Sequence, residues 1–344
     1  MTAADAPVTA AAAEPRSERS VARAGWMVVA RKEFADHLLS VRFVVLLLVL
    51  GVVAAIPLYF VADAIRSTAQ ASSGTPAIFI ALFWFAPSVT DQITLPSVAG
   101  FLAIVAPLLG LAFAFDAVNG ERARGTLPRL LSQPIHRDDV INGKFAAGLA
   151  VIGLVLVSIV GLIAAFGIIR LGILPAPGEI LRLVLWVLLT FVYVSFWLAF
   201  GMLLSVLVRQ AATSALIGFG VWILVTIFGG LITSLVGGFL APISGNDAQR
   251  LANNQVQELI SRLLPDTLYR EASLVLLSPQ AMSRDISTPA TIGGYQQAQQ
   301  QIATLTALDQ SFILVWPQVV ALVALTVACF AIAYVRFMRQ EVRA

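Results

Sequence analysis

Long apolar runs alternate with shorter polar segments along most of the chain. An α-helix rises about 1.5 Å per residue, so about 20 apolar residues are needed to cross the roughly 30 Å hydrocarbon layer of a membrane. Six runs reach this length, at residues 43–65, 98–118, 145–169, 183–208, 211–236 and 312–335. The pattern predicts an all-α integral membrane protein with six transmembrane helices.

Two further helices are predicted beside these spans. The apolar run at residues 77–87 is too short to span and indicates an interfacial or re-entrant helix. Residues 22–42 predict an amphipathic helix that lies along the inner leaflet, with Arg31 and Lys32 near the headgroups. A solvated segment with accidental periodicity is the alternative. The predicted apolar face holds Trp26, Ala30, Phe34, Leu38 and Val41.

The remaining segments differ in composition. Residues 1–21, rich in Ala with Pro and mixed charge, predict a disordered cytoplasmic tail. Within residues 237–311, apolar residues recur at helical spacing at 251–264 and at 295–308. A further helix is predicted after Pro265, with Asp266 as its N-cap. This pattern predicts a small helical extracytoplasmic domain held by the membrane helices. Residues 312–344 then supply the sixth span and a cytoplasmic C-terminus.

Charge sets the expected orientation. Only 12% of the residues are charged and 59% are hydrophobic, whereas soluble domains carry about a quarter charged residues. Fifteen of the 22 Lys and Arg residues fall on the side that holds both predicted termini. Because cytoplasmic loops retain Lys and Arg, both termini are predicted in the cytoplasm of a prokaryotic inner membrane. The positive balance is then a topology signal that requires no nucleic-acid partner.

Residues that commonly carry chemistry are scarce. Cys329 is the single cysteine, and His37 and His136 are far apart in sequence, so neither a disulfide nor a metal or catalytic site is expected. Ionisable residues of the spans fall near their ends, which argues against an ion-coupled carrier and suits lipophilic or amphipathic cargo. Five aromatic residues of the fourth span either line a pathway or serve packing and lipid contact: Phe191, Tyr193, Phe196, Trp197 and Phe200.

The polar segment, residues 117–144, is much longer than the two to eight residues that join most bundle helices. Thr126 can cap a short helix, and Pro134 can end it. Leu127, Leu130 and Leu131 would share one face of this helix, surrounded by Arg122, Arg124 and Arg129. Such an apolar face ringed by charge is suited to docking in a groove of another protein. A topology signal without docking is the alternative.

The polar segment resembles the second-span cytoplasmic loop of type-2 ATP-binding-cassette (ABC) permeases, an exporter group that includes the nitrous-oxide-reductase maturation permease. The helix ahead of the first span is similar to the connecting helix of the same group, through Arg31, Lys32, Glu33, Phe34, Leu38, Ser40 and Arg42. The matching loop residues are Glu121, Gly125, Thr126, Leu127, Leu130, Leu131, Ser132, Pro134, Arg137, Gly143 and Lys144.

The resemblance implies a division of labour between subunits. The polar segment would be a coupling helix inserted into an ABC ATPase, two copies of which would serve two permease subunits, identical or paralogous. This chain would bind no cofactor, and ATP and Mg would sit on the ATPase. Gly143 and Lys144 lack the upstream glycine of a phosphate-binding loop, so they indicate a loop end. No enzyme activity of its own is therefore expected.

Two functions from other classes remain open. One is a membrane scaffold or assembly factor that recruits an extracytoplasmic partner. The other is an integral-membrane enzyme, for which the sequence offers no convincing cluster of polar catalytic groups.

Overall fold

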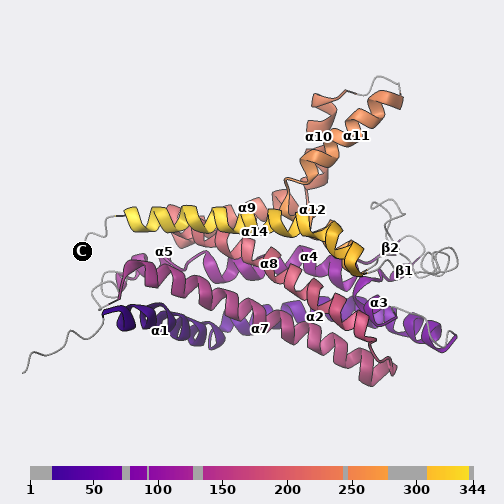
Figure 1. The fold of residues 1–344 in the computed structure, drawn as a ribbon, viewed down its shortest axis with the longest axis horizontal. Helices are drawn as coiled ribbons and strands as arrows, with labels where there is room; N and C mark the ends of the chain where they lie inside the picture. The colour runs from indigo at the N-terminus through magenta and orange to yellow at the C-terminus, as the bar shows by residue number, and fades with distance from the viewer. Residues whose placement is uncertain are drawn as a thin grey trace, which may run out of the picture.

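The computed structural model describes residues 18–71, 78–90, 93–126, 135–242, 247–277 and 308–340. They form a bundle of long helices with a hairpin projecting from one side (Figure 1). Two short strands, β1 (Ser88–Thr90) and β2 (Ile93–Thr94), pair antiparallel. The helices are α1 (Glu18–Leu38), α2 (Val41–Ala71), α3 (Ile78–Trp84), α4 (Val98–Ala114), α5 (Asn119–Ala123), α7 (Arg137–Leu171), α8 (Pro177–Leu207), α9 (Ala211–Thr226), α10 (Gly229–Leu240), α11 (Asp247–Ser261), α12 (Pro265–Leu277) and α14 (Leu308–Arg339).

Five described helices are long and apolar enough to cross a membrane, and α9 with α10 makes a sixth if the bent pair is one span. The five candidates lie in α2, α4 with α5, α7, α8 and α14. Each coincides with one of the apolar runs in the sequence. The multi-pass, almost entirely helical architecture is therefore confirmed, with the β1–β2 pair as a small addition.

The fifth predicted span, residues 211–236, is not one straight helix. α9 and α10 are bent by 63° relative to each other. The amide of Phe228 donates to the carbonyl of Ile223, five residues back, at 3.4 Å. A bond of this π type interrupts the α-helical ladder, and Gly229 and Gly230 follow it directly. The bend thus has a local backbone cause, and the boundary predicted at Gly237 falls inside α10.

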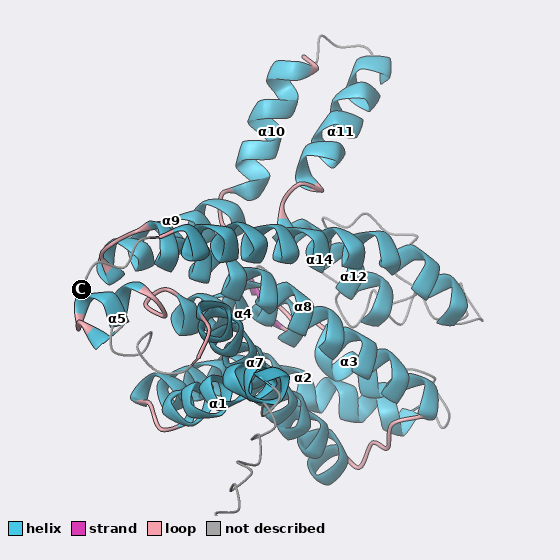
Figure 2. Ribbon diagram, turned by 60° about the vertical axis from the view of Figure 1, so that its left-hand side comes forward, coloured by secondary structure: helices cyan, strands magenta, loops and turns pink. Residues whose placement is uncertain are grey.

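Glycine allows the central helices to approach closely. α8 packs against α4, α7, α12 and α14 and lies in the middle of the bundle (Figure 2). A Cβ atom at Gly110 of α4 would lie 2.6 Å from the carbonyl oxygen of Val194 in α8. A Cβ atom at Gly201 of α8 would lie 2.9 Å from that of Ala114. A larger residue at either position would force α4 and α8 apart.

The short apolar run at residues 77–87 forms α3, which is buried in the bundle. Phe79 and Phe83 are at most 2% exposed. Glu179, in the first turn of α8, accepts the amide hydrogens of Phe79 at 2.9 Å and Ile80 at 3.3 Å. Because the first amides of a helix have no partner within it, this carboxylate caps α3. The short helix was predicted, and its burial against α2, α4 and α12 is the new observation.

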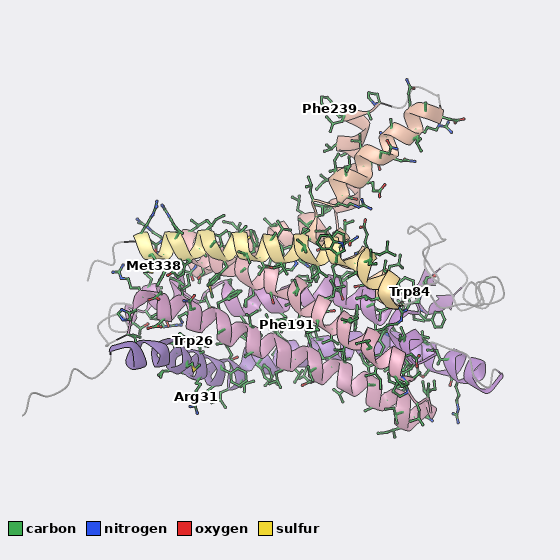
Figure 3. All side chains as sticks on the ribbon, viewed as in Figure 1. Trp26, Arg31, Trp84, Phe191, Phe239 and Met338 are labelled. Carbon is green, nitrogen blue, oxygen red and sulfur yellow. The ribbon has the colours of Figure 1, made fainter. Side chains whose placement is uncertain are left out.

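The predicted external domain divides into two unlike parts. α10 and α11 pair as the projecting hairpin, and Figure 3 shows Phe239 near its free end. α12 instead packs into the bundle against α8 and α14. Residues 278–307, which include most of the helix predicted at 295–308, lie outside the described residues. The predicted tail, residues 1–21, lies outside them up to residue 17.

A line of polar contacts joins α12 to α8. The hydroxyl groups of Thr190 and Tyr269 are 3.0 Å apart, and Trp186 Nε1 donates to Ser273 Oγ at 3.2 Å. Tyr193 donates to Asp266 at 3.3 Å, near the middle of α8. Asp266 was predicted to cap α12, but its carboxylate instead accepts from Tyr193 and, at 2.8 Å, from Arg270. An ionisable residue outside the candidate spans therefore contacts the middle of one of them, a contact that the sequence alone did not indicate.

The aromatic residues of α8 contribute to packing. Tyr193 and Trp197 are at most 1% exposed, and the ring of Tyr193 stacks on that of Tyr269 with centroids 4.4 Å apart. Phe196 and Trp197 meet edge to face at 5.3 Å. Of the two alternatives for this cluster, the structure favours packing over a pathway lining.

Candidate functional site

The first residues of the polar segment are hydrogen-bonded to the C-terminal end of α8. Ser205 Oγ accepts the amide hydrogens of Val118 at 3.0 Å and Asn119 at 3.2 Å. Asn119 is fully buried, and its side chain donates to the carbonyl of Val208 at 3.4 Å. One serine therefore satisfies two amides at the start of α5 that have no helical partner.

Just ahead of α5, Asp116 forms an ion pair with Arg42 of α2 at 2.8 Å. The guanidinium of Arg42 also lies over the ring of Phe115, 5.1 Å from its centroid. These contacts tie the exit of α4 to the start of α2.

The chain turns sharply after α5. Gly125 has φ of +65°, in the left-handed region that favours glycine at the end of a helix. Thr126 Oγ1 donates to the carbonyl of Glu121 at 3.2 Å, rather than capping a following helix in the described part of the chain. Residues 127–134, which include Leu127, Leu130, Leu131 and Pro134, lie outside the described residues. The apolar docking face thus stays a prediction.

The second end of the polar segment is the first two turns of α7. Asp139 accepts the backbone amide of His136 at 3.2 Å and closes the N-terminus of the helix, which starts at Arg137. Gly143 and Lys144 lie inside α7, so the loop end expected at these residues is wrong: the helix begins at Arg137, six residues before Gly143.

A buried ion network links both ends of the polar segment to α1. Lys144 Nζ lies 2.8 Å from Glu121 Oε1 in α5 and 3.1 Å from Glu33 Oε1 in α1. The side chain of Lys144 is only 4% exposed, and those of Glu121 and Glu33 are 9% and 12% exposed. Lys32 Nζ also lies 3.1 Å from Glu33. We call Glu33, Glu121 and Lys144 the buried triad.

The charged neighbours of Glu33 in and beside the triad lower its pKa. Burial alone would raise the pKa of Glu33, but the ammonium groups of Lys144 and Lys32 reverse this effect and hold the pKa below its ordinary value. Glu33 is therefore charged at neutral pH. Within the described residues, Glu121 Oε2 is buried and has no hydrogen-bond partner, so one acceptor of the triad is available for a further contact.

Gln340, directly after α14, connects the two ends of the polar segment a second time. Its side-chain oxygen accepts from Arg122 beside the triad, and its backbone carbonyl accepts from Arg137 Nη1 at 2.9 Å. Its side-chain nitrogen donates to the carbonyl of Val206 in α8 at 2.9 Å. The sequence analysis missed Gln340, because an isolated glutamine 200 residues away carries no pattern that points to this site.

α1 packs against α7 through a face that differs from the predicted stripe. Among residues 25–38 of α1, Gly25, Val29 and Glu33 are buried, and Phe34 packs partly against the core. Trp26 is 37% exposed, Leu38 is half-buried, and Arg31 points away from α7 (Figure 3). A Cβ atom at Gly143 of α7 would lie 2.7 Å from that of Val29, so the two helices touch at this glycine. The predicted face therefore lies one position away from the contact that the structure makes.

The contacts described above join the ends of the polar segment to α1, α7, α8 and α14. In the part of the chain that the structure describes, no group of three or more His, Cys, Asp or Glu residues could hold a metal ion. His37 meets the ring of Phe113 edge to face at 5.0 Å, and burial lowers the pKa of its imidazole.

The family model described as "ABC-2 family transporter protein" matches residues 27–342. The chain belongs to the ABC-2 family. It is thus a membrane transport subunit of the ABC permease kind, and the resemblance noted in the polar segment is confirmed at the level of the family.

Two curated relatives carry the name "Probable ABC transporter permease protein NosY". The protein from Stutzerimonas stutzeri is 29% identical over 171 residues, which cover 46% of this chain and 60% of that protein. The protein from Pseudomonas aeruginosa is 29% identical over 108 residues, which cover 29% of this chain and 37% of that protein. Both matches span less than two thirds of the relatives' own length.

Proposed function

We propose that this ABC-2 family member is the permease subunit of an exporter that is driven by a separate ABC ATPase. One observation carries the proposal. Both ends of the polar segment are held by the buried triad and by Gln340. Motion of a partner docked on this segment would be passed to the bundle through these contacts.

Closure of the ATPase subunits on ATP would push on residues 127–134 of each permease. The push would reach α7 and α1 through Lys144, and α14 through Gln340, and would rock the bundle between inward- and outward-facing states. ATP and Mg would be bound by the ATPase alone. The resemblance to type-2 exporters supports outward transport.

Two permease copies, identical or paralogous, with two ATPase copies would form the working unit. α9 supports a subunit contact, because its described buried residues are only Ser214 and Gly218. Exposed apolar side chains on the rest of α9 include Leu216 at 74% and Leu224 at 53%. A pathway between two such faces would have apolar walls suited to lipophilic or amphipathic cargo.

The proposed location is a prokaryotic inner membrane with both termini in the cytoplasm. The distribution of Lys and Arg supports this orientation. α1 would then lie at the cytoplasmic side, where its exposed Trp26, Met27 and Arg31 would contact lipid. The α10–α11 hairpin would be extracytoplasmic.

Leu130→Asp tests the docking assignment. A charge on the predicted apolar face is expected to weaken copurification of the ATPase on the order of tenfold or more, and to abolish substrate-stimulated ATP hydrolysis. Leu259→Asp is the matched control, because Leu259 is 66% exposed on α11, far from the polar segment. Both variants should still insert in the membrane. Full stimulation in Leu130→Asp would show that the ATPase docks elsewhere.

A membrane scaffold that transports nothing remains the second candidate, since the projecting α10–α11 hairpin offers exposed Leu235 and Phe239 to an external partner. The same purification separates the two functions. An exporter subunit brings down an ATPase in equal proportion, whereas a scaffold retains an extracytoplasmic protein and no ATPase.

A further inference from the structure

A cleft opens between α2 and α7 at the end of the bundle away from the polar segment. Its volume is about 380 Å³, near the lower end of the roughly 300 to 1,000 Å³ typical of ligand pockets. The charged and aromatic residues that line it are Tyr59, Phe60, Asp63 and Arg66 of α2, and Phe166 and Arg170 of α7. Figure 1 shows these ends of α2 and α7 at the lower right, on the side of the bundle opposite α9 and α10.

The cleft carries unneutralised guanidinium groups. Arg66 and Arg170 are exposed, and neither forms an ion pair within the described part of the chain. With Asp63 the lining has a net charge of +1. The planar fork of Arg matches phosphate oxygens in a bidentate manner, and charge-assisted hydrogen bonds of this kind are stronger than neutral ones. The cleft therefore complements an anion with a single negative charge.

Along both helices, the arginines that line the cleft lie closer to the helix end than the phenylalanines do. Phe60 precedes Arg66 by six residues and Phe166 precedes Arg170 by four, which places the rings about 9 Å and about 6 Å deeper in the bundle than the guanidinium groups. The candidate spans end at Asp63 in α2 and at Leu171 in α7. The arginines thus lie at the level of lipid headgroups, and the phenylalanines lie at the level of acyl chains.

Apolar groups next to the cleft face outward. Tyr59 is 77% exposed, Phe60 is 45% exposed, and Ile169 on α7 is 84% exposed. The rings of Tyr59 and Phe60 meet edge to face at 5.5 Å. This surface is accessible from the side, so a lipid can enter from the bilayer without crossing the bundle.

We propose that this cleft is a binding site for one anionic glycerophospholipid. Its phosphodiester would accept hydrogen bonds from Arg66 and Arg170, and the first methylenes of an acyl chain would pack on Phe60 and Phe166. Asp63 would disfavour a second negative charge, so the site selects a phosphodiester over a phosphomonoester. With the termini in the cytoplasm, as proposed above, the lipid comes from the outer leaflet.

Native mass spectrometry of the full chain in detergent, titrated with phosphatidylglycerol, tests the site. We expect one tightly retained lipid per chain in the wild type, and binding on the order of 100-fold weaker in the Arg66→Gln/Arg170→Gln double variant, because each lost charged hydrogen bond accounts for roughly tenfold. The matched control is Arg250→Gln/Arg336→Gln, which removes two exposed arginines elsewhere and should retain the lipid. Equal binding by both double variants would overturn the proposal.

Three further measurements identify the ligand. Glycerophosphoglycerol, which is the headgroup without acyl chains, should fail to displace the lipid at equal concentration; displacement would show a simple phosphate site and overturn the assignment to lipid. Phe60→Ala should weaken the binding of phosphatidylglycerol and leave the binding of the soluble headgroup unchanged. Asp63→Asn should improve binding of phosphatidic acid more than that of phosphatidylglycerol, and an unchanged preference would contradict the selectivity. None of these assays requires an ATPase, so they stand apart from the test of coupling.

Discussion

At the residue scale, the side chain of Lys144 is central to the stability of the buried triad. Its ammonium group lies between the carboxylates of Glu33 and Glu121, with distances of 3.1 and 2.8 Å, and almost no solvent reaches it. Desolvating three charges is costly, so the triad is stable only while all three members are present. Removing the lysine would leave the buried Glu121 without its ion-pair partner and Glu33 with only the exposed Lys32.

Lys144→Met is therefore expected to destabilise the bundle by about 3 to 5 kcal/mol at neutral pH. The lowered pKa of Glu33 sets the pH dependence. The charged Glu33 contributes its full stabilisation above the ordinary carboxyl pKa of 4.5. This contribution is lost as the pH falls through the lowered pKa of Glu33 in the folded protein. The difference in stability between wild type and variant should narrow as the pH falls, because a protonated Glu33 is neutral and no longer needs the ammonium group. Thermal unfolding in detergent at pH 7 and near pH 4 measures both effects.

Lys32→Met serves as the control for this variant. Lys32 contacts Glu33 and Asp36, but its side chain is 57% exposed, so its loss should cost no more than about 1 kcal/mol. Equal losses for the two lysine variants would mean that solvent screens the triad and that its burial is unimportant.

Helix contact at the element scale depends on where glycine falls. α1 and α7 meet at Gly143, where a Cβ atom would lie 2.8 Å from the carbonyl oxygen of Trp26 as well as 2.7 Å from Val29. Backbone atoms cannot yield as a flexible side chain can. The sequence places Gly143 in a family motif, and the structure supplies a steric reason for it.

Gly143→Ala should separate α1 from α7 and cost about 1 to 3 kcal/mol. Gly161→Ala in the same helix is the matched control, since nothing lies within 4 Å of its Cβ position. The control should show no loss of stability, because alanine favours a helix interior over glycine. Thermal unfolding, together with the rate of proteolysis of α1, distinguishes them. Similar behaviour of both variants would contradict the close contact.

The whole molecule combines a tightly packed bundle with a loosely attached hairpin. α12 is held in the bundle by Trp186, Thr190 and Tyr193 of α8, whereas α10 and α11 pack mainly on each other. The two ends of the hairpin meet, because a Cβ atom at Gly229 would lie 3.1 Å from the Leu264 side chain. The hairpin therefore leaves and rejoins the bundle at one place.

Replacing residues 230–263 by a short Gly-Ser linker should leave the bundle folded. We expect a thermal midpoint within about 4 °C of the wild type, equivalent to about 1 kcal/mol. Tyr269→Ala provides the contrast. Because Tyr269 of α12 is fully buried, this substitution should lower the free energy of unfolding by about 3 to 5 kcal/mol. Loss of the folded bundle on hairpin replacement, measured by circular dichroism and gel filtration, would show that the hairpin is part of the core.

Much of the architecture is readable from the sequence. The spans follow from the length of apolar runs, because a helix in hydrocarbon must satisfy its own backbone and cover itself with apolar side chains. The family resemblance follows from a local spacing of residues between Glu121 and Lys144. Each of these signals lies within a single stretch of chain, so no knowledge of tertiary contacts is needed to detect it.

Other features depend on which segments meet in space. Periodicity predicted an apolar, membrane-facing stripe on α1 but did not indicate its contact with α7, because the buried Gly25 and Glu33 are neither large nor apolar. Asp266 lies in a predicted external segment, yet α12 folds back and brings it to the middle of α8. Gln340 joins α14 to two arginines more than 200 residues away. Buried charges and long-range hydrogen bonds leave no periodic trace in a sequence, so only the tertiary structure decided them.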